Sequence, residues 1–202
     1  MRASRARSAE LYLLAEGQVS VEGEARPLDG LFFVIATQNP VQYSGTFPLP
    51  ESQLDRFMMR ISLGFPDINA EKQILLGDDN RGKLTQLPSR ISNEQLLAMQ
   101  EQISGVNASE SLLEYVIALC RVSRETSINT NPLSPRAGKA LLKAAKAWAF
   151  MENRDYVMPE DVQAVFAAVC EHRLETGTGE FSHNSGPVSQ LVLQQVDPVK
   201  PL

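Results

Sequence analysis

Residues 32–40 read Phe-Phe-Val-Ile-Ala-Thr-Gln-Asn-Pro, and residues 45–57 read Gly-Thr-Phe-Pro-Leu-Pro-Glu-Ser-Gln-Leu-Asp-Arg-Phe. The first five positions are apolar or small and two of them are β-branched, which is typical of a strand covered on both faces. Polar residues follow at the end of this strand, and open α/β sheets place their ligands in the crevice beyond the strand ends. We therefore expect the amide of Asn39 to face a ligand, and Arg56 follows shortly after it.

These two segments resemble the MoxR group of AAA+ ATPases. The pattern of that group runs from an apolar strand through Ala-Thr-Gln-Asn-Pro to Gly-Thr-(Phe/Tyr)-Pro-Leu-Pro-Glu-x-Gln-Leu-Asp-Arg-Phe. The resemblance extends from about residue 9 to about residue 174, and includes Gly-Gln-Val-Ser-Val-Glu-Gly at 17–23 and Leu-Ser-Pro-Arg-Ala at 133–137. It implies an α/β segment followed by an all-α segment: the carboxyl-terminal part of an AAA+ P-loop NTPase core, with an incomplete parallel sheet and a hairpin, and then a four-helix lid subdomain.

A phosphate-binding loop is absent from the sequence. Such a loop needs glycines that let backbone N–H groups approach phosphates, a lysine, and a Ser or Thr for magnesium. The nearest match, Gly-Asp-Asp-Asn-Arg-Gly-Lys-Leu at 77–84, ends in a leucine and carries two aspartates that would repel phosphate. It also follows a helix-like segment at 70–76, so we interpret it as an exposed loop. A Walker B strand ending in Asp-Glu is missing as well, because Leu-Leu-Gly-Asp-Asp at 75–79 is interrupted by glycine.

In relatives of this family, both missing elements precede the point at which this sequence begins. Arg2 and Ala3 are similar to the Asn-Arg-Ala that follows the Walker B acids, and Met1 stands where that asparagine would be. Ala-Glu-Leu-Tyr-Leu-Leu at 9–14 replaces a more regular Ala-Leu-Leu-Glu-Ala-Met helix. These departures favour an amino-terminal truncation or an altered reading frame. We expect the isolated chain to bind ATP weakly or not at all, and not to hydrolyse it.

Composition and charge narrow the class of protein. The 202 residues are 43% hydrophobic, enough for the core of one domain or two small ones. No apolar run approaches the roughly 20 residues needed to cross a bilayer, and the first five residues lack the apolar core of a signal peptide. These features predict no membrane span and a cytoplasmic location. A net charge of −5 argues against a general nucleic-acid binder, although it does not exclude a local basic surface.

Cysteine and histidine give no metal-binding pattern. Cys120 and Cys170 each fall on the apolar stripe of an expected helix, which favours two buried thiols over a disulfide or a metal pair. His172 and His183 have no companions at ligand spacing. We therefore predict no metal site within the chain itself.

The chain divides near Pro66. Residues 1–66 are expected to form the α/β portion, with a short helix to about residue 16, a hairpin turning at 22–24, the strand at 32–36 and a further strand at 60–65. In AAA+ relatives a hairpin at this place can face a central pore. An edge hairpin without a partner is equally compatible with the sequence.

Residues 67–175 have the pattern of a helical bundle. The capping box Ser-Asn-Glu-Gln at 92–95, Ser109, and Ser134 followed by Pro135 each open an amphipathic helix, and Pro159 opens a fourth.

Met158 occupies the cap of the fourth helix, where relatives place Ser or Thr, and we expect this to weaken the helix start by about 1 kcal/mol. Residues 176–202 are expected to be a mobile tail, with Leu-Val-Leu at 191–193 docking back onto the bundle.

The resemblance implies a catalytic role for two residues. Asn39 matches sensor 1, whose amide orients the attacking water or contacts the γ-phosphate. The alternative is that Asn39 caps a turn with Pro40. Arg56 matches the arginine finger, which crosses a subunit boundary to neutralise charge on the neighbour's γ-phosphate. The alternative for Arg56 is a salt bridge within the chain, to Asp55 or Glu51.

Arg136 matches sensor 2, a lid arginine that reports the nucleotide state to the helical bundle. Near the first turn of a helix an arginine opposes the helix dipole, so helix stability does not explain its place. A surface position without a role is the alternative, and the choice between its own and a neighbour's nucleotide stays open.

The resemblance further implies ATP and Mg²⁺ as cofactors, a homo-oligomeric ring, expected to be a hexamer, and protein substrates that the ring remodels or matures. A second function class is kept beside this one. It is a non-catalytic module that joins a ring or binds a partner, and donates Arg56 without hydrolysing ATP.

Overall fold

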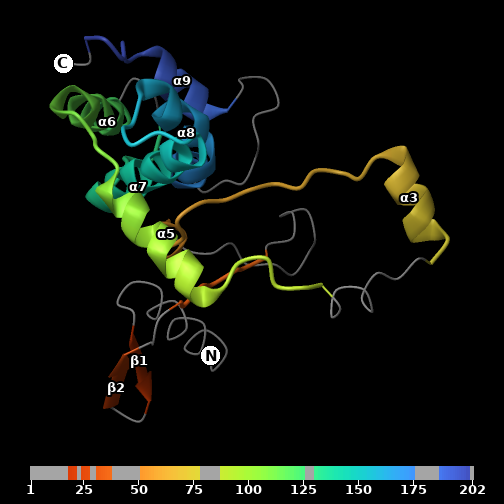
Figure 1. The fold of residues 1–202 in the computed structure, drawn as a ribbon. Helices are drawn as coiled ribbons and strands as arrows, with labels where there is room; N and C mark the ends of the chain where they lie inside the picture. Colours follow the sequence, from red (N-terminus) through yellow and green to blue (C-terminus); the bar gives the residue numbers. More distant parts are fainter. Residues whose placement is uncertain are drawn as a thin grey trace.

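A computed structural model describes residues 18–21, 24–27, 31–37, 51–77, 87–125, 130–175 and 187–200. Figure 1 shows a helical body near the carboxyl terminus, with the other described segments reaching away from it. The elements are β1 (Gln18–Val21), β2 (Glu24–Pro27), α2 (Glu51–Leu54), α3 (Ile68–Leu75), α5 (Asn93–Gly105), α6 (Glu110–Val122), α7 (Pro135–Met151), α8 (Pro159–Leu174) and α9 (Val188–Gln194).

The two strands form a hairpin. β1 pairs antiparallel with β2, with Gln18 opposite Pro27 and Val21 opposite Glu24. This is the place at which the sequence predicts a hairpin. The turn residue Gly23 lies outside the described residues.

The segment that we expected to be a strand covered on both faces is extended but has no paired strand in the described part of the chain. In it, 83% of Phe33 and 79% of Ile35 is exposed. The strand expected at 60–65 is likewise unpaired, with Leu63 and Phe65 almost fully exposed. A strand of a parallel sheet is buried only when other strands and helices flank it, and the described residues provide no such neighbours.

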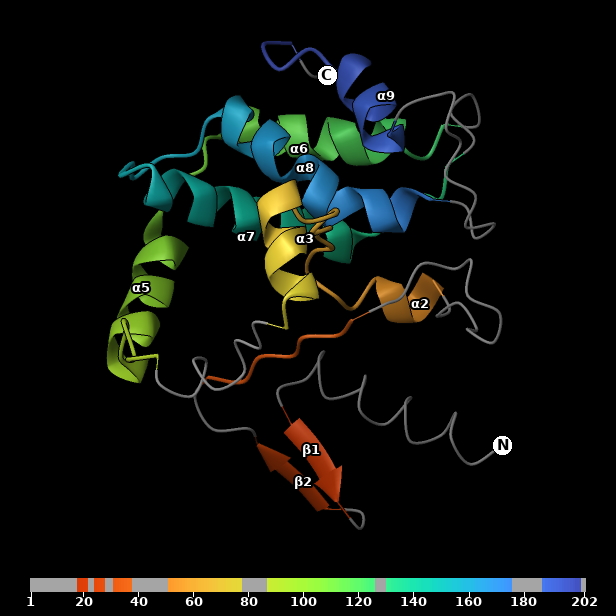
Figure 2. The same cartoon turned by 90° about the vertical axis from the view of Figure 1, so that its right-hand side faces the viewer.

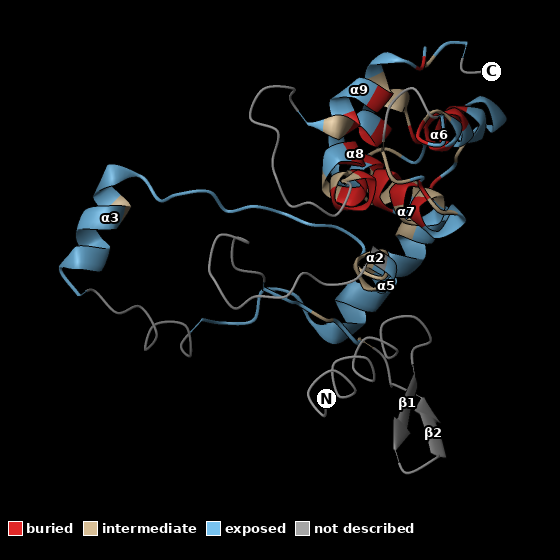
Figure 3. Ribbon diagram, turned by 180° about the vertical axis from the view of Figure 1, so that it is seen from behind, coloured by how far each residue is buried: buried red, intermediate tan, exposed pale blue. Residues whose placement is uncertain are grey.

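The core lies between α6, α7, α8 and α9, where the buried residues concentrate (Figure 3). α7 and α8 make the most extensive contact, and α9 packs on α8 and α6. Apolar residues at helical spacing on each helix face this core, as expected for amphipathic helices. Its largest fully buried side chains include Tyr115, Leu119, Leu133, Leu141, Val162, Phe166, Val169, Leu174 and Val192.

α5 differs from the bundle member that the sequence predicts. Its start is as expected, because Ser92 and Gln95 form both bonds of the capping box, at 2.8 and 3.2 Å. No residue of α5 is buried, however, and α5 runs away from the body after contacting α7 (Figure 2). Leu96 and Leu97 remain 40% and 44% exposed. The capping box fixes where the helix begins but carries no information on what its apolar side contacts.

α9, rather than the expected α5, joins α6, α7 and α8 in the packed body. Val192 is fully buried and Val196 is 5% exposed, so two valines four residues apart point into the core. The docking expected for 191–193 agrees with this packing. Residues 188–196 therefore pack on the body, within the range that we had expected to be a mobile tail.

The start of α8 is held by a residue that the sequence analysis overlooked. Met158 provides no side-chain hydrogen bond, but its N–H donates to Oδ2 of Asp161 at 2.7 Å. Arg154 donates to both carboxylate oxygens of Asp161, at 2.7 Å through Nη1 and by a shorter bond through Nη2. Burial acts to raise the pKa of Asp161, but the bonds from Arg154 and Met158 together lower it. Asp161 therefore offsets the missing cap.

Candidate functional site

Of the three residues predicted to respond to nucleotide, the structure describes two. Asn39 lies outside the described residues, which resume at residue 51. Arg56 and Arg136 are both described, and lie in different segments of the chain.

Arg56 belongs to a tight turn that follows the single helical turn α2. The N–H of Arg56 donates to the carbonyl of Gln53 at 3.2 Å, and that of Phe57 to the carbonyl of Leu54 at 3.1 Å. These bonds continue the helical winding through Arg56, which is half-buried. α2 contacts α8 of the helical body, so the turn that carries Arg56 is attached to this body.

Asp55 joins this turn to α7 and α8. Its Oδ1 accepts from Nε of Arg173 on α8 at 3.0 Å. The hydroxyl of Ser134, which caps α7, donates to both of its oxygens at 3.2 and 3.1 Å. Nη1 of Arg136 lies 3.6 Å from Oδ2. One carboxylate therefore brings together the two positions predicted to be the arginine finger and sensor 2.

Arg136 lies in the first turn of α7, directly after Pro135. Its side chain is 52% exposed, which leaves the guanidinium accessible to an anion as well as to Asp55. Because the amino-terminal end of a helix also favours negative charge, α7 and Arg136 present positive potential at the same place.

Arg173 is the most deeply enclosed cation of this cluster, with a side chain only 4% exposed. All five of its N–H donors have acceptors. Besides Asp55 Oδ1, they reach the carbonyl oxygens of Asp55, Phe57 and Met58 in the turn, and of Val169 on α8. A planar guanidinium can bind acceptors on several sides at once, which an ammonium cannot. Arg173 therefore fixes the backbone on both sides of Arg56.

A small hollow of about 230 Å³ opens beside these residues. It is lined by Ser52, Asp55, Asn131, Pro132, Ser134, His172 and Arg173. His172 is 4% exposed, and neither ring nitrogen has a hydrogen-bond partner of standard geometry among the described residues. Burial, followed by the charges of Arg173 and Arg60, lowers the pKa of His172 to about 4, against an opposing backbone interaction with Phe57. The imidazole is therefore neutral at pH 7.

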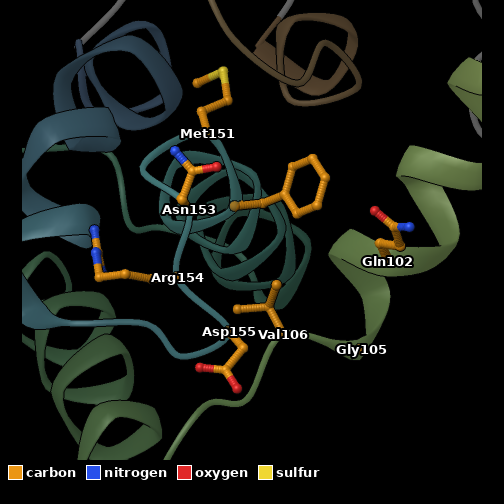
Figure 4. A pocket seen from close by; sticks show the side chains of 8 residues that line it. Gln102, Gly105, Val106, Met151, Asn153, Arg154 and Asp155 are labelled. Atoms are coloured by element: carbon orange, nitrogen blue, oxygen red, sulfur yellow. The ribbon is translucent and has the colours of Figure 1, made fainter.

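A larger hollow of about 590 Å³ lies at the other end of α7 (Figure 4). Its walls come from the end of α5 and from the turn after α7: Gln102, Gly105, Val106, Phe150, Met151, Asn153, Arg154 and Asp155. The rise along α7 from Arg136 to Met151 is about 22 Å, at 1.5 Å per residue. This hollow is therefore separate from the Asp55 cluster.

The cysteines are two free, buried thiols, as the sequence favours. Burial raises the pKa of both Cys120 and Cys170. Among the described residues, no three His, Cys, Asp or Glu side chains gather closely enough to hold a metal ion. The described helices include none whose length and apolar character would allow it to cross a membrane.

Sequence reasoning missed Asp55 and Arg173 as members of the site. A signal for Arg173 was present, because it follows Phe166 and Val169 at helical spacing and so falls on the apolar face of α8. A charged residue on a buried helix face requires a partner. The sequence could not identify that partner, which is 118 residues away.

Comparison with known proteins shows that Arg56 lies in one region that matches a family model, and that Arg136 and Arg173 lie in a second such region. Residues 2–59 match the model of the "ATPase family associated with various cellular activities (AAA)", and residues 121–192 match that of the "AAA lid domain". The chain is 34% identical over 182 residues to "Chaperone MoxR1" of Mycobacterium tuberculosis, covering 85% of this chain and 47% of the relative. The chain belongs to the MoxR-type AAA+ ATPases. The family resemblance drawn from the sequence is thereby confirmed, and the match is to the carboxyl-terminal part.

Two further relatives support this family assignment. "Uncharacterized protein YeaC" of Bacillus subtilis is 38% identical over 170 residues, covering 84% of this chain and 53% of that protein. A crystal structure of a candidate ATPase from Cytophaga hutchinsonii superposes with a TM-score of 0.80 at 34% identity, covering 96% of this chain and 62% of that one. The chain thus spans about half the length of the curated relatives that it matches.

Proposed function

We propose that this chain is the nucleotide-sensing part of a MoxR-type ATPase subunit, which works in a homo-oligomeric ring and couples ATP hydrolysis to the remodelling or maturation of protein complexes. The observation that carries the proposal is the meeting of the Arg56 turn and Arg136 on one carboxylate, Asp55. The name of one relative, a chaperone, supports action on proteins. The ring is an expectation from the family.

In this proposal Arg56 acts across a subunit boundary. Bound ATP with Mg²⁺ would supply the phosphoryl group and a metal that neutralises its charge. Arg56 places a guanidinium against the γ-phosphate held by the neighbouring subunit. In NTPases where it has been measured, such an arginine contributes about 10³ to 10⁵ in rate, because phosphoryl transfer depends on positioning and charge stabilisation.

Asn39 and Arg136 have supporting roles. Asn39 follows the extended segment 31–37 and would hold the attacking water through its amide. Arg136 stands at the positive end of α7, where a guanidinium and a helix amino terminus both attract phosphate. Through Arg136, the presence of a nucleotide would be communicated to α7 and the packed body.

The phosphate-binding loop is not part of these 202 residues. The chain by itself should therefore bind ATP weakly and should not hydrolyse it. We attribute ATP binding and ATP hydrolysis to a subunit that also carries the loop.

The native gene product provides the test. Its intact mass and terminal sequence are determined first, and its Mg²⁺-dependent ATPase activity is then measured beside the variants Arg56→Ala and Arg60→Ala. Arg60 is the matched control, since it belongs to the same segment but is paired with Glu175, the residue directly after α8, at 2.8 and 2.7 Å.

We expect a product that carries a phosphate-binding loop, and a fall of about 10³-fold in kcat for Arg56→Ala with ATP binding retained. Arg60→Ala should keep most of the activity. A native product without the loop would refute the ATPase proposal, as would an Arg56→Ala variant as active as the wild type.

A further inference from the structure

The segment that carries Arg56 has little support of its own. α2 is a single helical turn, and the extended residues 59–67 that follow it lie exposed (Figure 1). Such a short turn is not stable alone, because isolated helices need about 12 to 15 residues even with favourable sequences. The orientation of Arg56 must therefore be set by contacts from outside this segment.

Arg173 provides those contacts. Its guanidinium binds the carboxylate of Asp55 and three carbonyl oxygens, those of Asp55, Phe57 and Met58. These groups flank Arg56 on both sides, so the backbone at Arg56 is fixed relative to α8. Since α8 packs extensively on α7, these bonds attach the turn to the helical body.

The same carboxylate also contacts α7, through Ser134 and Arg136. A displacement of the start of α7 relative to α8 would therefore change the position of Asp55. The turn with Arg56 lies directly on this connection.

From this geometry we propose that Arg173, acting with Asp55, is the positioning residue of the arginine finger, and that it couples the orientation of Arg56 to the α7–α8 body. The inference rests on the function proposed above for Arg56. Arg173 does not contact nucleotide in this proposal, and acts on the reaction only through Arg56.

The test uses Arg173→Lys, which retains the positive charge beside Asp55. Lysine has three donors on one nitrogen and cannot reach the carbonyls of residues 55, 57 and 58 together. The control is Arg60→Lys, which weakens a two-bond pair between the same segment and Glu175, at the carboxyl-terminal cap of the same helix, and leaves the contacts of the Arg56 turn unchanged.

In the native ATPase, Arg173→Lys should lower kcat by about 100-fold, since a misplacement of roughly 1 Å costs that much, while KM for ATP stays unchanged. In the 202-residue chain, hydrogen exchange at the amides of Arg56 and Phe57 should be about 10-fold faster, with exchange in the α7–α8 core unchanged. Arg60→Lys should change neither quantity by more than about threefold.

Arg56→Ala is measured in parallel to separate the two claims. If Arg56→Ala loses activity and Arg173→Lys keeps both its kcat and its exchange rates, the positioning role is refuted and the proposed function stands. If Arg56→Ala keeps its activity, the proposed function fails. Should Arg173→Lys fail to fold, Asp55→Asn leaves Arg173 bound to the carbonyls and should give a smaller loss of kcat in the same direction. An unchanged kcat in Asp55→Asn would refute the coupling.

Discussion

Replacing Asp161 by Asn should destabilise the helical body, because Asp161 replaces the missing cap of α8. Asp161 is 2% exposed and accepts three hydrogen bonds, two from Arg154 and one from the N–H of Met158. Asn has nearly the same volume but only one accepting oxygen. Its amide N–H₂ would face a donor of Arg154 or of Met158.

The expected loss of stability follows from the hydrogen bonds that the substitution removes. A hydrogen bond to a charged group contributes about 1.5 to 3 kcal/mol, and breaking a buried ion pair costs about 3 to 5 kcal/mol. The side chain of Arg154 is 20% exposed and can regain water, so the lower part of this range applies. We expect a loss of about 3 kcal/mol in the free energy of unfolding, equivalent to roughly 12 to 24 °C in Tm for a body of about 100 residues.

Urea unfolding followed by circular dichroism and by the fluorescence of Trp148, the single tryptophan, measures this loss. Glu160→Gln is the matched control. It removes an exposed charge from the same first turn of α8 and should cost no more than about 1 kcal/mol. Because the pKa of Asp161 lies below its ordinary value of 3.8, the stabilisation is present above that pH and is lost as pH falls through the lowered pKa. Equal effects of Asp161→Asn and Glu160→Gln would refute the capping role.

Three further predictions concern the packed body. The pKa of His172 is about 4 when folded and 6.5 ordinarily, so the unfolded chain binds more protons between these values. Stability should therefore fall by up to about 3 kcal/mol as pH drops from 6.5 to 4, and His172→Gln should abolish that part of the slope in urea titrations; an identical slope would contradict this. Gly138→Ala should raise the free energy of unfolding by about 0.5 to 1 kcal/mol, because alanine is favoured over glycine inside a helix such as α7 and the new Cβ would lie 3.4 Å from Sγ of Cys120 on α6; destabilisation would show that this contact is too tight. Cys120 and Cys170 should react with a thiol reagent only at the rate of unfolding, because both are buried and the pKa of each is raised; rapid labelling at pH 8 would be inconsistent with this packing.

The helices of the body could be predicted because their signals are local. Ser109 and Ser134 cap α6 and α7 as the sequence indicates, and Pro159 opens α8. Each signal acts within one helical turn, so neighbouring residues are sufficient to reveal it.

The packing partners could not be predicted in this way. α5 begins at its capping box but leaves its apolar residues largely exposed, whereas α9 has no side-chain cap and buries Val192. Which apolar helix face becomes buried depends on how all the helices of the body are arranged. The same holds for the extended segment 31–37, whose apolar character predicts burial that only further strands and helices can provide.

The candidate site was predicted by family pattern and only partly by physics. Arg56 and Arg136 could be named from the motifs, but the ion pair of Arg136 with Asp55 and the enclosing contacts of Arg173 depend on distant parts of the chain. Residue type alone indicated only that a buried arginine needs an acceptor.

The measurement that tests the central claim most directly is a subunit-mixing ATPase assay with the native protein. One variant carries Arg56→Ala, and the other carries alanine at the lysine of the phosphate-binding loop. If Arg56 acts on the neighbour's nucleotide, each variant alone is inactive and the mixture regains activity, because an intact loop then meets an intact Arg56. A mixture that stays inactive, although the two variants demonstrably assemble together, would contradict the assignment of Arg56 as an arginine finger acting between subunits.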